Sequence, residues 1–246
     1  MNPIHRLALL ALLYLLSGGC HAQTGSTPAP SIRETQILHP PSRSPETPLP
    51  LVIALHGLGD TPEKFLTLFK SPPLNARVIA LEGWRPYHSG YTWFPFPSYG
   101  EDKERQLHLA IQESATRVRD TIAELTRRFP TRGLPIVTGF SQGGMLSFYL
   151  ALQHPDILSA ALPIAGSFSS LAVTDTSAQS VPIVAFHGKS DARVPYETTY
   201  TNIEQLRKKG APVKLYSYPS LGHQLNEDEF EDWRRELAAA ITRAAH

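Results

Sequence analysis

Short runs of apolar residues alternate with amphipathic stretches over most of the chain. A continuous apolar run of this kind is typical of a strand that is buried on both faces of a parallel sheet. We therefore predict strands at 51–55, 76–81, 136–138, 159–166, 181–186 and 213–218, and an edge strand within 32–38. Strands that are separated by helical segments predict an α/β fold with a mostly parallel central sheet.

Apolar residues spaced three and four positions apart predict the helices between these strands. The longest helix is expected over 101–129, and two others over 197–209 and 228–244. Further helices are expected to begin at Thr61, a capping residue followed by proline, and directly after Ser141. Charged residues fill the outer face of the helix at 101–129, which is typical of a solvated surface.

Residues 84–99 carry many aromatic side chains and no periodic pattern. Loops of this length without regular structure are uncommon in compact domains unless they bind something. We predict that Trp93 and Phe94 form an apolar wall for the acyl or leaving group of a substrate. A hydrophobic cover over the sheet is an equally good interpretation, and the two are compatible.

The first 22 residues have the layout of a secretory signal peptide. Arg6 precedes an apolar run over 7–16, which is too short for a comfortable transmembrane span. Cys20, the one cysteine of the chain, stands where a bacterial lipoprotein signal places its lipid-modified residue, although Ser17 occupies a position that usually holds leucine. Cleavage after Ala22 is the alternative. Both interpretations predict an exported protein, either periplasmic or membrane-anchored, or otherwise secreted.

The next segment, residues 23–50, is rich in proline, serine and threonine. Such a composition favours extended and poorly packed backbone, so we predict a tether that contains the first edge strand near its middle. The folded domain is then expected to span 51–246.

Composition narrows the choice of function. A chain of 246 residues with 41% hydrophobic and 18% charged residues fits one globular α/β domain. The formal net charge of +1 and the lack of a Lys/Arg stripe argue against nucleic acid or an anionic membrane surface as a partner. A membrane is then expected only through a lipid on Cys20. Histidine and aspartate are too dispersed to suggest a zinc motif, and no cofactor is required for the chemistry below.

The most specific chemical motif is Gly-x-Ser-x-Gly, which spans 139–143. It follows a β-branched run and precedes an apolar helical segment, and a strand that turns sharply into a helix holds the serine in a strained, exposed position. Ser141 is therefore the candidate nucleophile. Ser167 has no such glycine spacing and no helix signal after it, so we discount it.

Two later loops supply a candidate acid and base. Asp191 follows the strand at 181–186, and His223 follows the last strand and precedes the terminal helix. The order Ser, Asp, His is the one expected when parallel strands bring a catalytic triad together. A turn aspartate that bonds its own backbone is the alternative for Asp191. An imidazole titrates near neutral pH and can carry the serine proton.

The loop after the strand at 51–55 supplies a candidate oxyanion hole. Glycines on both sides of Leu58 let the backbone turn its N–H toward the neighbouring strands, and the N–H of Gln142 is expected to provide the second donor. His56 and His187, which stand at the ends of two strands, are expected to be structural.

These motifs, taken in order, resemble the phospholipase/carboxylesterase family of α/β-hydrolases, to which the acyl-protein thioesterases belong. The resemblance covers the chain from 51 onward and is carried by 55–60, 93–94, 139–144, 187–191 with 194–195, and 222–223. It implies a mostly parallel sheet with helices on both faces and no large cap domain. It also implies cleavage of carboxylic esters or thioesters, with the triad and oxyanion residues at the positions named above.

We therefore predict a serine hydrolase that acts on small-molecule esters through a covalent acyl-enzyme. Two alternatives stay open at this point. One is an exported feruloyl- or polyester-type esterase, and the other is a catalytically inactive, surface-anchored binding protein. The sequence carries no signal for an oligomeric state.

Overall fold

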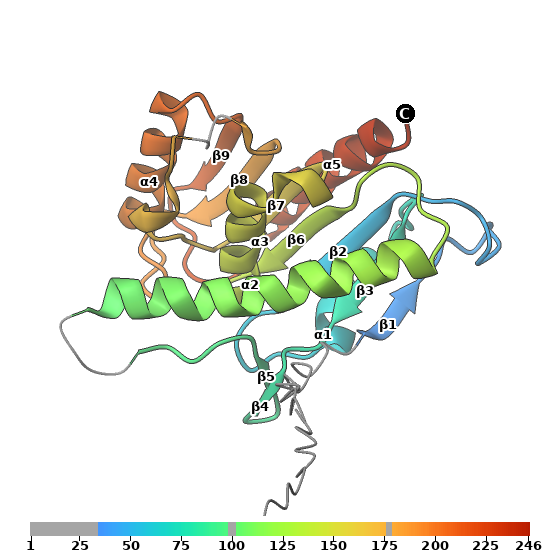
Figure 1. Ribbon diagram of the computed structural model, residues 1–246, viewed down its shortest axis with the longest axis horizontal. Helices are drawn as coiled ribbons and strands as arrows, with labels where there is room; N and C mark the ends of the chain where they lie inside the picture. Colours follow the sequence, from blue (N-terminus) through green and yellow to red (C-terminus); the bar gives the residue numbers. More distant parts are fainter. Residues whose placement is uncertain (1–33, 98–101, 176–178) are drawn as a thin grey trace, which may run out of the picture.

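The computed structural model describes residues 34–97, 102–175 and 179–246 of the chain (Figure 1). The predicted signal peptide over 1–22, with Cys20, lies outside these ranges, as does the first part of the predicted tether. Within them, no helix combines the length and apolar character that crossing a membrane requires.

A seven-stranded sheet runs through the middle of the domain, with the strand order β1-β3-β2-β6-β7-β8-β9. Its strands are β1 Glu34–Leu38, β2 Leu51–Leu55, β3 Arg77–Leu81, β6 Ile136–Phe140, β7 Ala160–Ile164, β8 Ile183–Gly188 and β9 Val213–Tyr218. Strand β1 pairs antiparallel with β3, and every other neighbouring pair is parallel. The predicted mostly parallel sheet is confirmed.

Helices cover both faces of this sheet (Figure 1). They are α1 Pro62–Leu66, α2 Lys103–Arg128, α3 Gln142–Gln153, α4 Tyr196–Lys208 and α5 Glu227–Ala244, with short 3-10 turns η1 Thr67–Phe69, η2 Pro155–Ile157 and η3 Ser170–Ala172. Successive side chains of a strand point to opposite faces. Leu51, Ile53 and Leu55 accordingly pack with α2, α3 and α4, whereas Val52 and Ala54 pack with α1 and α5.

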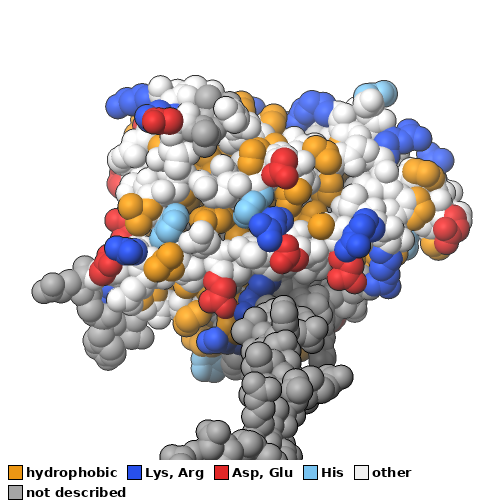
Figure 2. Space-filling view, in the orientation of Figure 1, with side chains coloured by type: hydrophobic (Ala, Val, Ile, Leu, Met, Phe, Trp, Pro, Cys, Tyr) orange, Lys and Arg blue, Asp and Glu red, His pale blue; other side chains and the backbone are white. Residues whose placement is uncertain are grey.

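The outer face of α2 carries charges of both signs. Figure 2 shows lysine, arginine, aspartate and glutamate side chains interspersed over this side of the molecule, with no large patch of one sign on the visible face. This distribution agrees with a solvated helix surface and gives this face no field directed at polyanions.

The prediction that 84–99 lacks regular structure is wrong. Strands β4 Arg85–Tyr87 and β5 Gly90–Thr92 form an antiparallel hairpin. The strands are only three residues long and β4 is exposed, so they leave no apolar alternation in the sequence. A Cβ at Gly90 would lie 2.4 Å from the carbonyl oxygen of Asp60, so a glycine is required where the hairpin meets the loop after β2.

The predicted boundary between tether and domain also needs correction. The side chain of Leu49 is buried, and the buried guanidinium of Arg77 donates hydrogen bonds to the carbonyl oxygens of Pro45, Thr47 and Pro130. These contacts tie the described end of the predicted 23–50 tether to the sheet. The folded domain therefore includes this segment and β1 and does not begin at 51.

Candidate active site

Ser141 lies in the sharp turn between β6 and α3. Its backbone has φ 54° and ψ −111°, a combination that is strained for a residue with a side chain, and its N–H donates to the Ile164 carbonyl oxygen at 2.9 Å. A Cβ at Gly143 would lie only 2.0 Å from the carbonyl oxygen of Leu55. The glycine therefore lets β2 approach the turn, which holds the serine at the carboxyl edge of the sheet.

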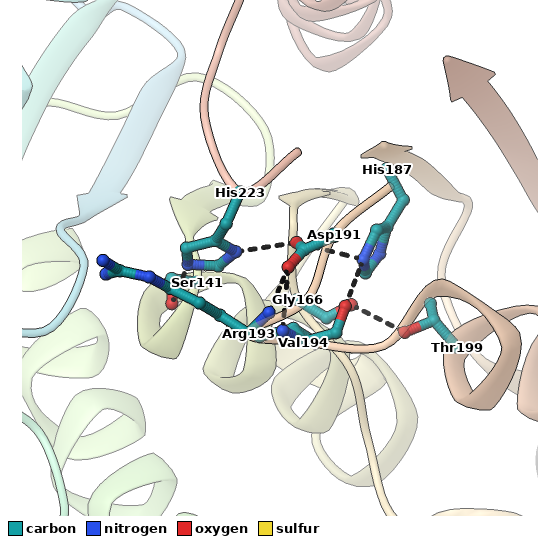
Figure 3. A network of polar contacts seen from close by, with 8 residues as sticks. All are labelled: Ser141, Gly166, His187, Asp191, Arg193, Val194, Thr199 and His223. Atoms are coloured by element: carbon teal, nitrogen blue, oxygen red, sulfur yellow. Dashed lines mark hydrogen bonds and ion pairs between the residues drawn. The ribbon is translucent and has the colours of Figure 1, made fainter. Parts of the chain in front are cut away.

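The structure brings three of the predicted side chains into one row of hydrogen bonds (Figure 3). The Nε2 atom of His223 lies 2.9 Å from the Ser141 hydroxyl oxygen, and the Nδ1 atom lies 2.7 Å from Oδ2 of Asp191. A proton on Nδ1 is then donated to the carboxylate, which leaves Nε2 free to accept the serine proton. Ser141 and Asp191 are 8% and 5% exposed, so little water competes for these bonds.

The Asp191 carboxylate also organises its own loop. Its Oδ1 atom accepts the backbone N–H groups of Arg193 and Val194, each at 2.9 Å. The two interpretations of this residue are thus both met in the structure, because one oxygen closes the turn while the other faces His223. The turn fixes the carboxylate in the orientation that the imidazole needs.

His56 and His187 hold backbone, as predicted. In His56, Nδ1 lies 2.7 Å from the carbonyl oxygen of Gly57, and Nε2 accepts the N–H of Gly83 at 3.0 Å. In His187, Nε2 lies 2.9 Å from the carbonyl oxygen of Val194. Burial lowers the pKa of both imidazoles, so each is neutral at pH 7 and adds no charge beside the row.

The two predicted oxyanion donors come from separate segments, the loop after β2 and the start of α3. Leu58 lies in the loop after β2 and lines the same cavity as Ser141, and no hydrogen bond between described residues uses its N–H. Gln142 is the first residue of α3, where backbone N–H groups have no partner within the helix. The positive end of the helix dipole lies at the same place and favours a negative charge beside the serine.

The side chain of Gln142 has a role that the sequence did not reveal. Its Oε1 atom accepts the backbone N–H of Trp93 at 3.1 Å and the hydroxyl of Thr92 at 3.0 Å, and its Nε2 donates to the carbonyl oxygen of Phe94 at 2.8 Å. The amide is fully buried and joins the start of α3 to the end of β5. A glutamine next to the nucleophile is the only sequence signal for this contact.

The wall predicted from Trp93 and Phe94 is not formed by these side chains. Both are fully buried, and the indole N–H of Trp93 donates to the carbonyl oxygen of His56 at 2.8 Å inside the core. Phe96, two residues further on, is 43% exposed and packs edge-on against Phe94. The alternative of a hydrophobic cover describes Trp93 and Phe94, and from this aromatic segment it is Phe96 that lines the cavity with Ser141.

Two cavities meet at Phe96. The first has a volume of about 390 Å³ and contains the row described above; it is lined by Gly57, Leu58, Asp60, Phe140, Ser141, Arg193, Val194 and His223. The second has a volume of about 890 Å³ and is mainly apolar; its lining includes Leu107, Ile111, Met145, Phe168 and Pro195. Phe96 is the one lining residue that the two cavities share.

Metal ligands do not gather at this site. Over the part of the chain that the structure describes, no group of three or more His, Cys, Asp or Glu side chains is arranged to hold a metal ion.

The profile of a known family spans most of the chain. The phospholipase/carboxylesterase family matches residues 41–241. The chain belongs to this family. Membership makes the protein a hydrolase of the esterase type, and both the predicted resemblance and the predicted α/β-hydrolase fold are confirmed.

Individual relatives agree with this assignment. A probable carboxylesterase of Oryza sativa subsp. japonica is 31% identical over 106 residues, which are 40% of this chain and 44% of that protein. Acyl-protein thioesterase 1 of Gibberella zeae is 22% identical over 202 residues, 74% of this chain and 86% of that protein. The crystal structure of esterase PE8 superposes with a TM-score of 0.72 at 21% identity, covering 86% of this chain and 100% of that one, and it shows the fold.

Proposed function

We propose that this family member cleaves carboxylic esters, and thioesters of similar shape, through Ser141, His223 and Asp191 and a covalent acyl-enzyme. The observation that carries the proposal is the unbroken row from the serine hydroxyl through the imidazole to the carboxylate, with distances of 2.9 and 2.7 Å. The names of the relatives, which include carboxylesterases and an acyl-protein thioesterase, support the two substrate classes.

The first half-reaction forms the acyl-enzyme. The Ser141 oxygen attacks the carbonyl carbon while Nε2 of His223 takes the hydroxyl proton. The carbonyl oxygen becomes an oxyanion, which the N–H groups of Leu58 and Gln142 stabilise. The carbon–oxygen or carbon–sulfur bond to the leaving group then breaks, and the imidazolium gives its proton to the departing oxygen or sulfur, which leaves as the alcohol or thiol.

In the second half-reaction, water hydrolyses the acyl-enzyme, and His223 again acts first as base and then as acid. His223 takes a proton from water as the water oxygen attacks the acyl carbon, and the bond to Ser141 breaks as the proton returns to the serine oxygen. The products are the free acid and the original enzyme. Asp191 keeps its negative charge throughout and stabilises the imidazolium that forms twice in each cycle.

Covalent labelling tests the nucleophile directly. A fluorophosphonate probe is expected to modify one residue stoichiometrically, because an activated serine beside an oxyanion hole displaces fluoride from phosphorus. Peptide mapping by mass spectrometry should place the adduct on Ser141, and the Ser141→Ala variant should remain unlabelled. An unlabelled wild-type protein that also hydrolyses no nitrophenyl ester would instead support the binding-protein alternative.

A short series of nitrophenyl esters of different acids separates the enzymatic alternatives. Faster release from short and medium aliphatic acyl groups agrees with the proposal, since the second cavity is mainly apolar. A marked preference for aromatic acids would favour the feruloyl-type alternative.

Export is the second part of the proposal, and it rests on the signal-like sequence of residues 1–22. If Cys20 carries the lipid, the full chain expressed in a bacterium should partition into the detergent phase of a Triton X-114 extract. The Cys20→Ser variant should move to the aqueous phase. Detergent partitioning that survives this substitution would contradict a lipid anchor at Cys20.

A further inference from the structure

Arg193 places a positive charge in the cavity that contains the proposed nucleophile and base. Its backbone is fixed, because its N–H donates to Oδ1 of Asp191 at 2.9 Å. Its side chain lines the 390 Å³ cavity together with Ser141 and His223. In Figure 3 this side chain extends from its loop along the side of the site where Ser141 lies. Arg193 is solvent-exposed, and its fixed backbone places its charge in the cavity that contains Ser141 and His223.

The guanidinium of Arg193 forms no hydrogen bond and no ion pair with any residue that the structure describes. Asp191, the acid nearest in sequence, is not an ion-pair partner for this guanidinium. Its side chain is fully buried, and both its oxygens already face N–H groups. A planar guanidinium is well suited to bind a carboxylate or a phosphate through two parallel hydrogen bonds. An unpaired arginine in a substrate cavity therefore points to an anionic ligand group.

The other charges that line this cavity favour binding of an anion near Arg193 and disfavour it near Asp60. Asp60 lies in the loop after β2, whereas Arg193 lies in the loop after β8, and β6, which leads to Ser141, stands between these strands in the sheet. An anionic group is thus repelled from the wall with Asp60 and attracted to the wall with Arg193. The amino-terminal end of α3 adds a positive potential beside Ser141.

We propose that Arg193 binds an anionic group on the leaving part of the substrate, so that preferred substrates are esters of alcohols or thiols that carry a carboxylate or phosphate. The leaving part is indicated because His223, which must protonate it, shares the first cavity with Arg193. The larger cavity beyond Phe96 is lined by neither residue. This inference rests on the proposed function.

A matched pair of esters tests the inference. The butyrate of 5-hydroxy-2-nitrobenzoic acid carries the anion on its leaving group, and the butyrate of 5-hydroxy-2-nitrobenzamide is its neutral counterpart. Arg193→Gln is expected to lower the ratio of their kcat/KM values about 10-fold. Arg193→Lys should retain part of the preference, and Arg193→Glu should reverse it. Raising the ionic strength should reduce the wild-type ratio but not that of Arg193→Gln.

Lys189→Gln is the control for a simple change in net charge. Lys189 lies in the same loop but points over the ring of Tyr196 and does not line the cavity, so its loss should leave the ratio unchanged. A second pair, mono-4-nitrophenyl adipate and 4-nitrophenyl hexanoate, carries the charge on the acyl part. An Arg193→Gln effect confined to this pair would overturn the assignment to the leaving part.

The two proposals fail in different ways. If the wild type hydrolyses the neutral esters and Arg193→Gln shows wild-type ratios for both pairs, the role of Arg193 is wrong and the proposed function stands. If the wild type hydrolyses none of the four esters, the proposed function fails, and the inference about Arg193 fails with it.

Discussion

Ser141→Ala is expected to lower kcat for a 4-nitrophenyl ester by about 10⁵- to 10⁶-fold. In the proposed mechanism, the substitution removes the oxygen that forms the acyl-enzyme and leaves His223 without a serine hydroxyl to deprotonate. The residual rate should still exceed that of the ester in water, because the N–H groups of Leu58 and Gln142, the proposed oxyanion donors, remain in place. The loss is measured by steady-state kinetics over a range of ester concentrations. The protein should come from a host preparation that is free of other esterases.

The control is the serine that lies in the next loop along the sheet. Ser167 follows β7 and lines the second cavity, but no described imidazole forms a hydrogen bond with its hydroxyl. Ser167→Ala should therefore retain kcat within a few-fold of the wild-type value. Loss of activity in Ser167→Ala with retention in Ser141→Ala would show that the nucleophile has been assigned wrongly. Thermal melts of both variants establish that the fold is intact.

The proximity of the three proposed triad residues was predictable because it follows from topology. Ser141 comes directly after β6, Asp191 and His223 lie in the loops after β8 and β9, and these three strands are parallel. The carboxyl ends of parallel strands meet at one edge of the sheet, so residues far apart in sequence meet there as well. The hydrogen bond between His223 and Ser141 closes a separation of 82 residues in this way.

The positions of the aromatic side chains were not predictable, because they depend on contacts across the chain. The segment with Trp93 and Phe94 is held by the buried amide of Gln142, and the indole N–H of Trp93 finds its acceptor at His56. Neither contact leaves a pattern in the local sequence. Because Phe94 is buried in the core, Phe96 is the aromatic residue of this segment that lines both cavities.

The start of the domain was placed wrongly for a related reason. A proline-rich segment without apolar periodicity resembles a tether, yet its carbonyl oxygens are the acceptors that the buried Arg77 needs. A buried guanidinium without such acceptors would be strongly unfavourable. Hydrogen bonds from a side chain to a distant carbonyl do not depend on the acceptor's residue type, so the sequence of the segment does not mark them.

A buried acid close to Asp191 leads to the second large prediction. Glu229 lies in the first turn of α5, where its N–H donates to Oδ1 of Asn226 at 2.9 Å. Its side chain is fully buried, and neither carboxyl oxygen has a hydrogen-bond partner among the described residues. Burial and the negative charge of Asp191 raise the pKa of this carboxyl from 4.5 to about 8. Glu229 is therefore protonated in the folded protein at pH 7.

This raised pKa makes the free energy of unfolding depend on pH. Between pH 4.5 and about 8 the folded protein retains a proton on Glu229 that the unfolded chain releases. Stability must then fall as the pH rises through this window, by at most about 1.4 kcal/mol per pH unit, and the contribution is constant below and above it. The neutral imidazoles of His56 and His187 act in the opposite direction at acidic pH, because their lowered pKa values cost stability as the pH falls.

Glu229→Gln is expected to stabilise the protein by about 2–3 kcal/mol at pH 7 and by much less at pH 5. The amide has almost the same shape as the carboxylic acid and cannot ionise, so the variant loses the cost of keeping the glutamate protonated. Urea unfolding at pH 5, 6, 7 and 8 measures the difference between variant and wild type, in which the histidine contributions cancel. Glu231→Gln, on the exposed side of the same helix, should show no such trend. A Glu229→Gln difference that is independent of pH would mean that this carboxyl is ionised in the folded state.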